Sequence, residues 1–314
     1  MLTIVRGKLK ILNIALPLSS AYLLISHGSR DPRPHQAMER LAEQVRSQLE
    51  RRGWGQGEIN DSCSLNSPIS QPLAPNQELL PRNRAGYFQG NRVLQRAEAK
   101  PATPTVVSRK CHYPLVGTAT LELADTALHE QIRQFASTAV AGGCNQIQLL
   151  PLFLLPGVHV REDIPAEVAL AQRDLGEAVA LNVRPHVGAH PGLGRLLASQ
   201  WSGVDRDAKI LLSHGSRRVG GNQPVEAVAQ ELGAVAAYWS VQPMLEEQIQ
   251  VLVARGHKRI EILPYFLFPG GITDAIAQKL DILQTEFPSV KLTLREPIGT
   301  SDILANLIVD LIEP

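Results

Sequence analysis

Hydrophobic residues follow two alternating patterns along this chain, short apolar runs and longer amphipathic stretches. In the first part, the apolar runs predict strands at 22–26, 115–123, 146–154 and 179–184. Apolar residues at helical spacing predict helices between them, at 34–52, 126–141 and 162–176. The second part repeats the scheme, with strands expected at 209–213, 259–264 and 290–294 and helices at 222–238, 243–255, 272–287 and 301–312. Strands separated by helices of this length indicate parallel sheets with right-handed crossovers.

Short motifs recur along the chain in the same order. Ser-His-Gly-Ser-Arg occurs at 26–30 and again at 213–217, each time directly after an apolar run. Two further blocks are Pro-x-Phe-Leu-x-Pro-Gly, at 151–157 and 264–270, and Glu-Gln-Ile, at 130–132 and 247–249. Such self-similarity indicates an internal duplication. The predicted fold is therefore α/β, with two similar doubly wound parallel-sheet domains.

The duplication sets the expected domain boundaries. We predict an N-terminal domain at 21–199 and a C-terminal domain at 208–314. The first domain contains an insertion at about 53–108 that is rich in Gly, Pro, Ser, Asn and Gln and lacks periodicity. Its second part is basic, which fits a solvated loop or a docking segment. Residues 1–20 resemble a signal peptide superficially, but Asn13 and Pro17 interrupt the apolar stretch, so a flexible leader is predicted.

Composition excludes several classes of protein. Net charge is +1, without the basic excess typical of nucleic-acid or membrane-surface binders. No apolar run approaches the roughly 18 residues that a transmembrane helix needs. The 3 cysteines are far apart, so neither a disulfide framework nor a zinc ribbon is expected. These features predict a cytoplasmic protein without nucleic-acid or membrane partners.

Candidate chemistry lies at the ends of three predicted strands. His27, Glu122 and His159 each follow an apolar run, and ligands of parallel sheets bind beyond the carboxyl ends of strands. Two imidazoles and a carboxylate suit a divalent first-row metal such as iron(II) or cobalt(II). Each histidine taken alone is equally compatible with an ordinary hydrogen-bonded residue. A phosphate cradle or a Ser29 nucleophile is disfavoured, because the glycine spacings of those motifs are absent.

Three segments resemble a known family. Residues 24–33, 151–165 and 188–191 are similar to signature motifs of sirohydrochlorin chelatases of the CbiX/SirB type, class II chelatases related to ferrochelatase. This resemblance implies a pair of α/β domains facing a cleft. It also implies a lyase-type enzyme that inserts Fe²⁺ or Co²⁺ into sirohydrochlorin without ATP, with no tightly bound cofactor. The metal is then a substrate, and its product with iron is sirohaem.

The resemblance also implies roles for particular residues. His27 and His159 match the metal-site histidines of the family, and Glu122 matches its acidic residue. All three are predicted as metal ligands and catalytic residues, and either the carboxylate or an imidazole can accept the pyrrole protons as general base. Sirohydrochlorin carries carboxylates around its rim, so nearby guanidinium groups are candidate substrate anchors. The candidates are Arg30, Arg33 and Arg161.

The sequence is compatible with several alternatives. Iron insertion is favoured over cobalt insertion because the long duplicated form resembles chelatases of sirohaem synthesis. A non-catalytic metal or tetrapyrrole binding protein is a further alternative. Matching the halves places Ile272 at the position of His159 and Trp239 at that of Glu122, so the second half is predicted to hold a degenerate site around His214. The oligomeric state is left open, with a monomer of two pseudo-symmetric halves as one possibility.

Overall fold

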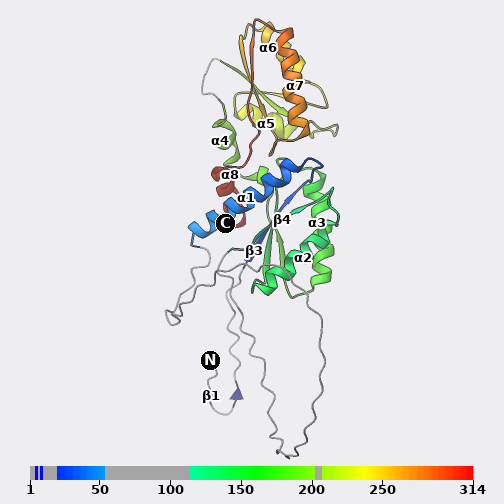
Figure 1. The fold of residues 1–314 in the computed structure, drawn as a ribbon, viewed down its shortest axis with the longest axis vertical. Helices are drawn as coiled ribbons and strands as arrows, with labels where there is room; N and C mark the ends of the chain where they lie inside the picture. Colours follow the sequence, from blue (N-terminus) through cyan, green and yellow to red (C-terminus); the bar gives the residue numbers. More distant parts are fainter. Residues whose placement is uncertain (1–3, 6–7, 10–19, 54–113, 202–206, 314) are drawn as a thin grey trace, which may run out of the picture. The chain divides into compact units, whose positions relative to one another are not determined.

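The computed structural model describes residues 4–5, 8–9, 20–53, 114–201 and 207–313 (Figure 1). The predicted leader and the predicted insertion at 53–108 therefore lie almost entirely outside the described residues. Within the leader, β1 (Ile4–Val5) and β2 (Lys8–Leu9) pair antiparallel.

The first half contains a four-stranded sheet in which all neighbouring strands run parallel. Its strand order is β4-β3-β5-β6. The strands are β3 (Ser20–Ser26), β4 (Val116–Thr120), β5 (Gln146–Pro151) and β6 (Ala180–Val183). The central strand β3 is buried on both faces, with Tyr22 and Leu24 in one apolar cluster and Leu23 and Ile25 in another. Burial of both faces explains its continuous apolar run.

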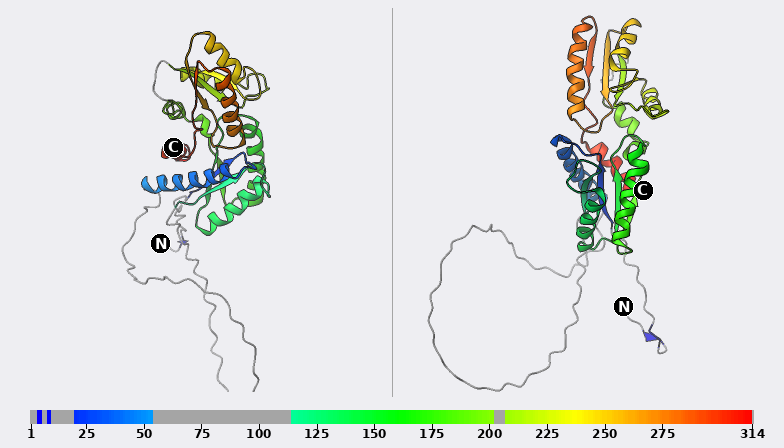
Figure 2. Two further views of the ribbon diagram at one scale, coloured as in Figure 1. Left: turned by 45° about the horizontal axis from the view of Figure 1, so that its top comes forward. Right: turned by 90° about the vertical axis from the view of Figure 1, so that its right-hand side faces the viewer.

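Helices cover both faces of this sheet, as the two views of Figure 2 show. They are α1 (Pro32–Arg51), α2 (Leu128–Ala141) and α3 (Ile164–Leu175). Helix α1 begins at a clear signal: Pro32 occupies the first turn, and the Asp31 carboxylate accepts the backbone N–H of Arg33 at 2.9 Å. The α2 and α3 side contributes one apolar cluster, and α1 contributes to the other.

The second half repeats this architecture. Its sheet has the order β10-β9-β7-β8, again entirely parallel, so the second strand in each half lies at an edge beside the first. The strands are β7 (Ala208–Ser213), β8 (Val235–Tyr238), β9 (Arg259–Pro264) and β10 (Lys291–Leu294). The helices are α5 (Gln223–Glu231), α6 (Leu245–Ala254), α7 (Gly271–Glu286) and α8 (Asp302–Ile312). The predicted fold class is confirmed.

One predicted element is wrong. The helix expected at 222–238 is two elements, α5 and the edge strand β8. The break falls at Gly233, whose φ of +64° lies in the left-handed region that stops a helix. The short apolar run after this glycine continues the helical pattern by chance, and only its pairing with β7 makes it a strand. Two short helices were also not predicted, η2 (Val187–Ala189) and α4 (Leu193–Ala198).

The last helix of the second half packs on the first half. Helix α8 contacts α1 and β5, and Figure 1 shows it beside α1. Asp310 of α8 receives the Arg52 guanidinium at 2.6 Å and lies 3.7 Å from the His190 ring of the third sequence motif. One apolar cluster accordingly contains residues of both halves. The domains predicted from sequence therefore share a core, and α8 extends from the second half onto the first.

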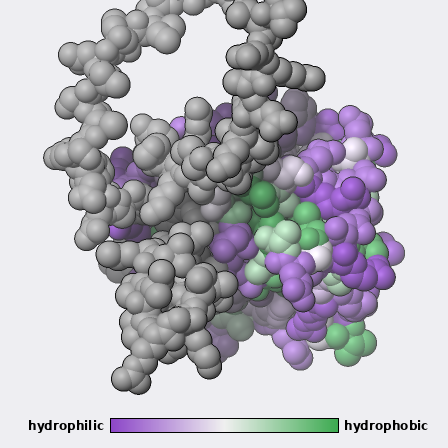
Figure 3. Space-filling view, turned by 90° about the horizontal axis from the view of Figure 1, so that it is seen from below, coloured by the Kyte–Doolittle hydropathy of each residue, from purple (hydrophilic) through white to green (hydrophobic). Residues whose placement is uncertain are grey.

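The coloured part of the face in Figure 3 is mainly hydrophilic, with an apolar patch near the centre and smaller apolar spots at the right and lower right. Among the described residues, no helix combines the length and apolar character needed to cross a membrane.

Candidate active site

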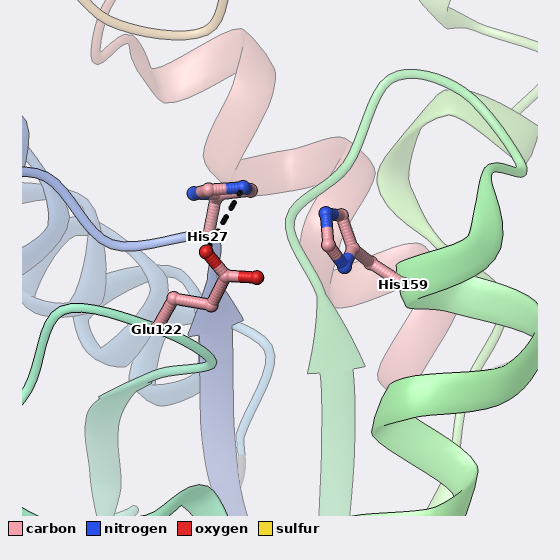
Figure 4. Close-up of side chains that lie close together, drawn as sticks. All are labelled: His27, Glu122 and His159. Atoms are coloured by element: carbon pink, nitrogen blue, oxygen red, sulfur yellow. Dashed lines mark ion pairs between the residues drawn. The ribbon is translucent and has the colours of Figure 1, made fainter.

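The structure brings together the three residues expected at strand ends. His27 directly follows β3, Glu122 lies two residues beyond β4, and His159 begins a π-helical turn, η1 (His159–Asp163), after β5. One potential ligand atom from each lies within 4.8 Å of the others. Figure 4 shows the two imidazole rings and the carboxylate pointing toward a common space. The group therefore has the composition and the compactness of a site for a divalent ion.

The spacing of these side chains leaves their ligand atoms free. His27 Nε2 lies 3.9 Å from Glu122 Oε2, which is too long for a hydrogen bond. The rings of His27 and His159 are 4.9 Å apart at 81°. Ligand distances of about 2.1 Å put two ligands of one ion at most about 4.2 Å apart. Small side-chain rotations would bring the ligand atoms close enough to bind one ion. The side chains of His27 and Glu122 are half exposed, which permits such rotations.

Gly28 allows the loops after β3 and β4 to touch. Its φ is +99°, and a Cβ there would lie 2.0 Å from the backbone oxygen of Glu122. The backbone N–H of Glu122 donates to the carbonyl of His27 at 2.9 Å, which extends the β3–β4 pairing beyond the strands. Only glycine combines this backbone angle with this approach. Gly28 is therefore a geometric requirement for placing His27 beside Glu122.

Two residues near the cluster were not predicted as site residues. Asp163 Oδ2 lies 2.7 Å from His159 Nδ1, and the Phe153 ring lies 6.5 Å from that of His27 and 5.9 Å from that of His159. A carboxylate accepts hydrogen bonds, so in the neutral imidazole this contact places the proton on Nδ1 and leaves the lone pair of Nε2 for a metal. The spacing of four residues between His159 and Asp163 was the signal in the sequence that could have identified the pair.

A pocket of about 890 Å³ adjoins the cluster and is lined by residues from both halves. The first half contributes His27 and His35, and the second half contributes His214. Much of the remaining wall is apolar, including the second Pro-x-Phe-Leu-x-Pro-Gly motif through Phe266, Leu267 and Phe268. Glu122 and His159 are not part of the lining, so the cluster borders the pocket through His27.

The three arginines proposed as anchors differ in their surroundings. Arg33 contacts the carboxylates of Asp31 and Asp274, each at 2.5 Å, which joins the first turn of α1 to that of α7. Hydrogen bonds from Arg33 lower the pKa of both carboxyls, and the two carboxylates raise that of Arg33. Its donors are thus engaged within the protein. Arg30 and Arg161 are exposed and have no side-chain hydrogen bond or ion pair within the described ranges.

Sheet register identifies the counterparts in the second half. His214 follows β7 as His27 follows β3. Pro264 pairs with β7 as Pro151 pairs with β3, so Ile272 occupies the position in the second half that His159 occupies in the first. The backbone N–H of Ser240 donates to His214 O at 3.0 Å, as that of Glu122 does to His27 O. The counterpart of Glu122 is therefore Ser240, and the prediction of Trp239 was one residue out. The sequence match of Glu-Gln-Ile misled because the loops before α2 and α6 differ in length.

Both halves of the chain match one known protein family. The CbiX family model matches residues 94–203 and 208–314. The first match includes Glu122 and His159 and begins beyond His27, whereas the second includes His214. Together the two copies cover well over half of the chain, in agreement with the duplicated fold.

Curated relatives and solved structures agree with this match. The sirohydrochlorin ferrochelatase of Priestia megaterium is 25% identical over 232 residues, 70% of this chain and 85% of that protein. The sirohydrochlorin cobaltochelatase of the same organism is 24% identical over 198 residues, 58% of this chain and 64% of that protein. A structure of SirB from Bacillus subtilis with Fe³⁺ superposes with a TM-score of 0.63 at 18% identity, covering 94% of each chain, which shows the shared fold. With its duplicated parallel sheets and both halves matched by the family model, the chain belongs to the CbiX family.

Proposed function

We propose that the chain is a sirohydrochlorin ferrochelatase, which inserts Fe²⁺ into sirohydrochlorin without ATP to give sirohaem. The observation that carries this proposal is the compact group of His27, Glu122 and His159 beside a pocket of about 890 Å³. A volume of this order suits a large organic ligand. Relatives at 24% and 25% identity are sirohydrochlorin chelatases, which supports the choice of substrate.

The cluster would first capture the metal ion. His27 and the Nε2 atom of His159 offer neutral imidazole nitrogens, and Glu122 offers a carboxylate oxygen. These ligands replace part of the water shell of the ion and hold it at the border of the pocket. The exposure of His27 and Glu122, each about half, gives a hydrated ion access to the cluster.

The macrocycle would bind in the pocket with one face toward His27, so that a metal held there can reach its four central nitrogens. The apolar residues Phe266, Leu267 and Phe268 offer a surface for its flat faces. Its carboxylates need cationic partners, and the unpaired guanidinium groups of Arg30 and Arg161 remain the candidates for that role. We assign Arg33 instead to the contact between α1 and α7, since two carboxylates already engage it.

Insertion exchanges two pyrrole protons for one divalent cation. The macrocycle loses two N–H protons as four ring nitrogens bind the metal, so the charge balances without any further reactant. Pyrrole N–H is a very weak acid, and the approaching cation supplies most of the activation. Glu122 would accept a proton as general base once the metal leaves its carboxylate for the ring. The second proton passes to an imidazole or to water.

Iron is proposed over cobalt on the strength of the relatives. The ferrochelatase of Priestia megaterium aligns over 85% of its length, and the cobaltochelatase over 64%. The donor set itself accepts either ion. Cobalt insertion is therefore the competing outcome of the test below.

Anaerobic absorption spectroscopy tests the proposal. Purified protein is mixed with sirohydrochlorin and either Fe²⁺ or Co²⁺, and the loss of the metal-free spectrum is timed against a protein-free control. We expect catalysed insertion of both ions, with the larger kcat/KM for Fe²⁺. A larger value for Co²⁺ would reverse the metal assignment. Tetrapyrrole binding without acceleration over the control would show a binding protein instead of an enzyme.

A further inference from the structure

The π-helical turn beside the cluster ties His159 to the helix that follows it. The backbone N–H of Ile164 donates to the carbonyl of His159, and the His159 ring contacts Asp163 at 2.7 Å. Ile164 itself is fully buried and begins α3. His159 is thus held through both its backbone and its side chain by two consecutive residues. Turns of this kind occur frequently at functional sites.

Comparison of the two halves shows that this turn contains one additional residue. Buried positions of α3 are Ile164, Val168 and Ala171, and those of α7 are Ile276, Leu280 and Leu283, with the same spacing. Counting back to the matched glycines, Ile164 is seven residues beyond Gly157, whereas Ile276 is six beyond Gly270. The first half therefore has one more residue between the motif and the helix core, and the π turn is where it lies.

The second half lacks all three parts of this arrangement together. Helix α7 begins directly at Gly271 with no π turn among its described residues. Ile272 occupies the position equivalent to His159. Ala275 directly precedes the first buried position of α7 and is equivalent to Asp163. The imidazole, its carboxylate partner and the additional residue are present together in one half and absent together from the other. This joint occurrence indicates that they act as a unit.

We infer that Asp163 is a positioning residue for His159, and that the one-residue π turn is the device that confines the metal site to the first half. The inference rests on the proposed metal-binding role of His159. By accepting the Nδ1 proton, the carboxylate selects the tautomer whose Nε2 lone pair is free, and it fixes the plane of the ring. The backbone bond to Ile164 anchors the same residue to the core of the first half.

Binding of Co²⁺ to the tetrapyrrole-free protein tests this inference without recourse to turnover. The variants are Asp163→Asn, Asp163→Ala, Asp163→Glu and His159→Ala. We expect Asp163→Asn and Asp163→Ala to weaken Co²⁺ binding by about 10- to 100-fold, the usual effect of losing such a partner. Their visible ligand-field spectra should also change, because the ring is no longer held. Asp163→Glu keeps the carboxylate and should recover part of the affinity.

Asp174→Asn is the matched control. Asp174 lies near the end of α3, is 51% exposed against 45% for Asp163, and pairs with Arg133 at 3.2 Å. We expect this variant to bind Co²⁺ as the parent protein does, with a Tm equal to that of Asp163→Asn. In insertion assays, Asp163→Asn should lower kcat/KM for the metal and leave the KM for sirohydrochlorin unchanged.

The outcomes separate the inference from the function on which it rests. Parent-like Co²⁺ affinity and spectrum in both Asp163→Asn and Asp163→Ala, with loss in His159→Ala, would overturn the positioning role and leave the metal site standing. Parent-like binding in His159→Ala would overturn the metal site itself, and the inference with it. Loss in the Asp163 variants, combined with a parent-like Asp174→Asn, supports both.

Discussion

At the residue scale, His27 and His214 occupy equivalent positions beside one pocket but have different neighbours. His27 has Glu122 and His159 within reach, whereas the counterparts around His214 are Ser240 and Ile272, which provide no comparable ligand set. A single imidazole is a poor site for a divalent ion. This difference predicts unequal effects of mutating the two histidines.

We expect His27→Ala and His159→Ala each to reduce insertion at limiting metal by more than about 100-fold, since loss of a ligand should exceed loss of its outer partner. His214→Ala should reduce it only a few-fold. Both partly exposed site histidines contribute little to the core, so Tm should be unchanged in each variant. Insertion rates and thermal unfolding of the three proteins are the measurements. A reversed ranking, or metal bound at His214, would contradict the asymmetry.

Gly28 provides a second prediction at this scale. Gly28→Ala should abolish metal binding, because its Cβ would meet the Glu122 carbonyl and force the two loops apart. Left-handed strain adds a loss of stability of about 1–3 kcal/mol. Gly53→Ala is the control, since Gly53 also has positive φ (+83°) but a Cβ there would meet no heavy atom within 4 Å apart from its chain neighbours. Co²⁺ titration and Tm of the two variants separate strain from displacement of the site.

At the element scale, the packing of α8 on the first half makes the stability of that half depend on a helix encoded in the second. Ile308 of α8 is fully buried in the shared cluster, whereas Ile303 on the same helix is 53% exposed. We expect Ile308→Ala to lower the free energy of unfolding by about 2–5 kcal/mol and Ile303→Ala to have a small effect. Hydrogen exchange should locate the loss of protection in β5 of the first half. A loss of protection confined to the second half would contradict the packing of α8 on the first half.

The Arg33 contact between α1 and α7 predicts a dependence on pH. Hydrogen bonds from Arg33 lower the pKa of Asp31 and Asp274 from the ordinary 3.8, so the folded state favours the charged carboxylates. The stability that the contact provides is therefore complete above that value and is lost as the pH falls through the lowered pKa values. We expect the difference in unfolding free energy between the parent and Arg33→Ala to be constant near neutrality and to shrink below pH 3.8.

Chemical denaturation at a series of pH values measures this difference. High salt should reduce it as well, because the groups are exposed and screened. A difference that grows on acidification would show that the pairing does not stabilise the fold.

At the scale of the whole molecule, the segment between α1 and β4 is expected to be dispensable. Arg46 of α1 donates to the carbonyl of Val116 at 3.2 Å, so the end of α1 lies near the start of β4. A Gly/Ser linker of about ten residues spans roughly 17 Å and should replace 53–108. Loop closure entropy changes slowly with length, so Tm and insertion rate should stay close to those of the parent. A variant that fails to fold would show that this segment is structural.

Much of this fold follows from local patterns. Apolar runs and helical spacing predicted the alternation of strands and helices, and the repeated motifs predicted two similar sheets. His27 and His159 could be identified because their motifs stand at strand ends, where parallel sheets bind ligands. The boundary of α5 failed because Gly233 interrupts a pattern that stays apolar on both sides.

The sequence by itself predicted most of the elements, the duplication and the three residues of the proposed metal site, because each rests on local patterns and short motifs, but it missed β8, η2 and α4. Tertiary structure alone decided which residue matches Glu122, since sheet register places Ser240 there. It also decided that Arg33 joins α1 to α7 and that α8 packs on the first half. Those contacts join residues more than a hundred positions apart, and no local periodicity specifies which distant surface a helix will cover.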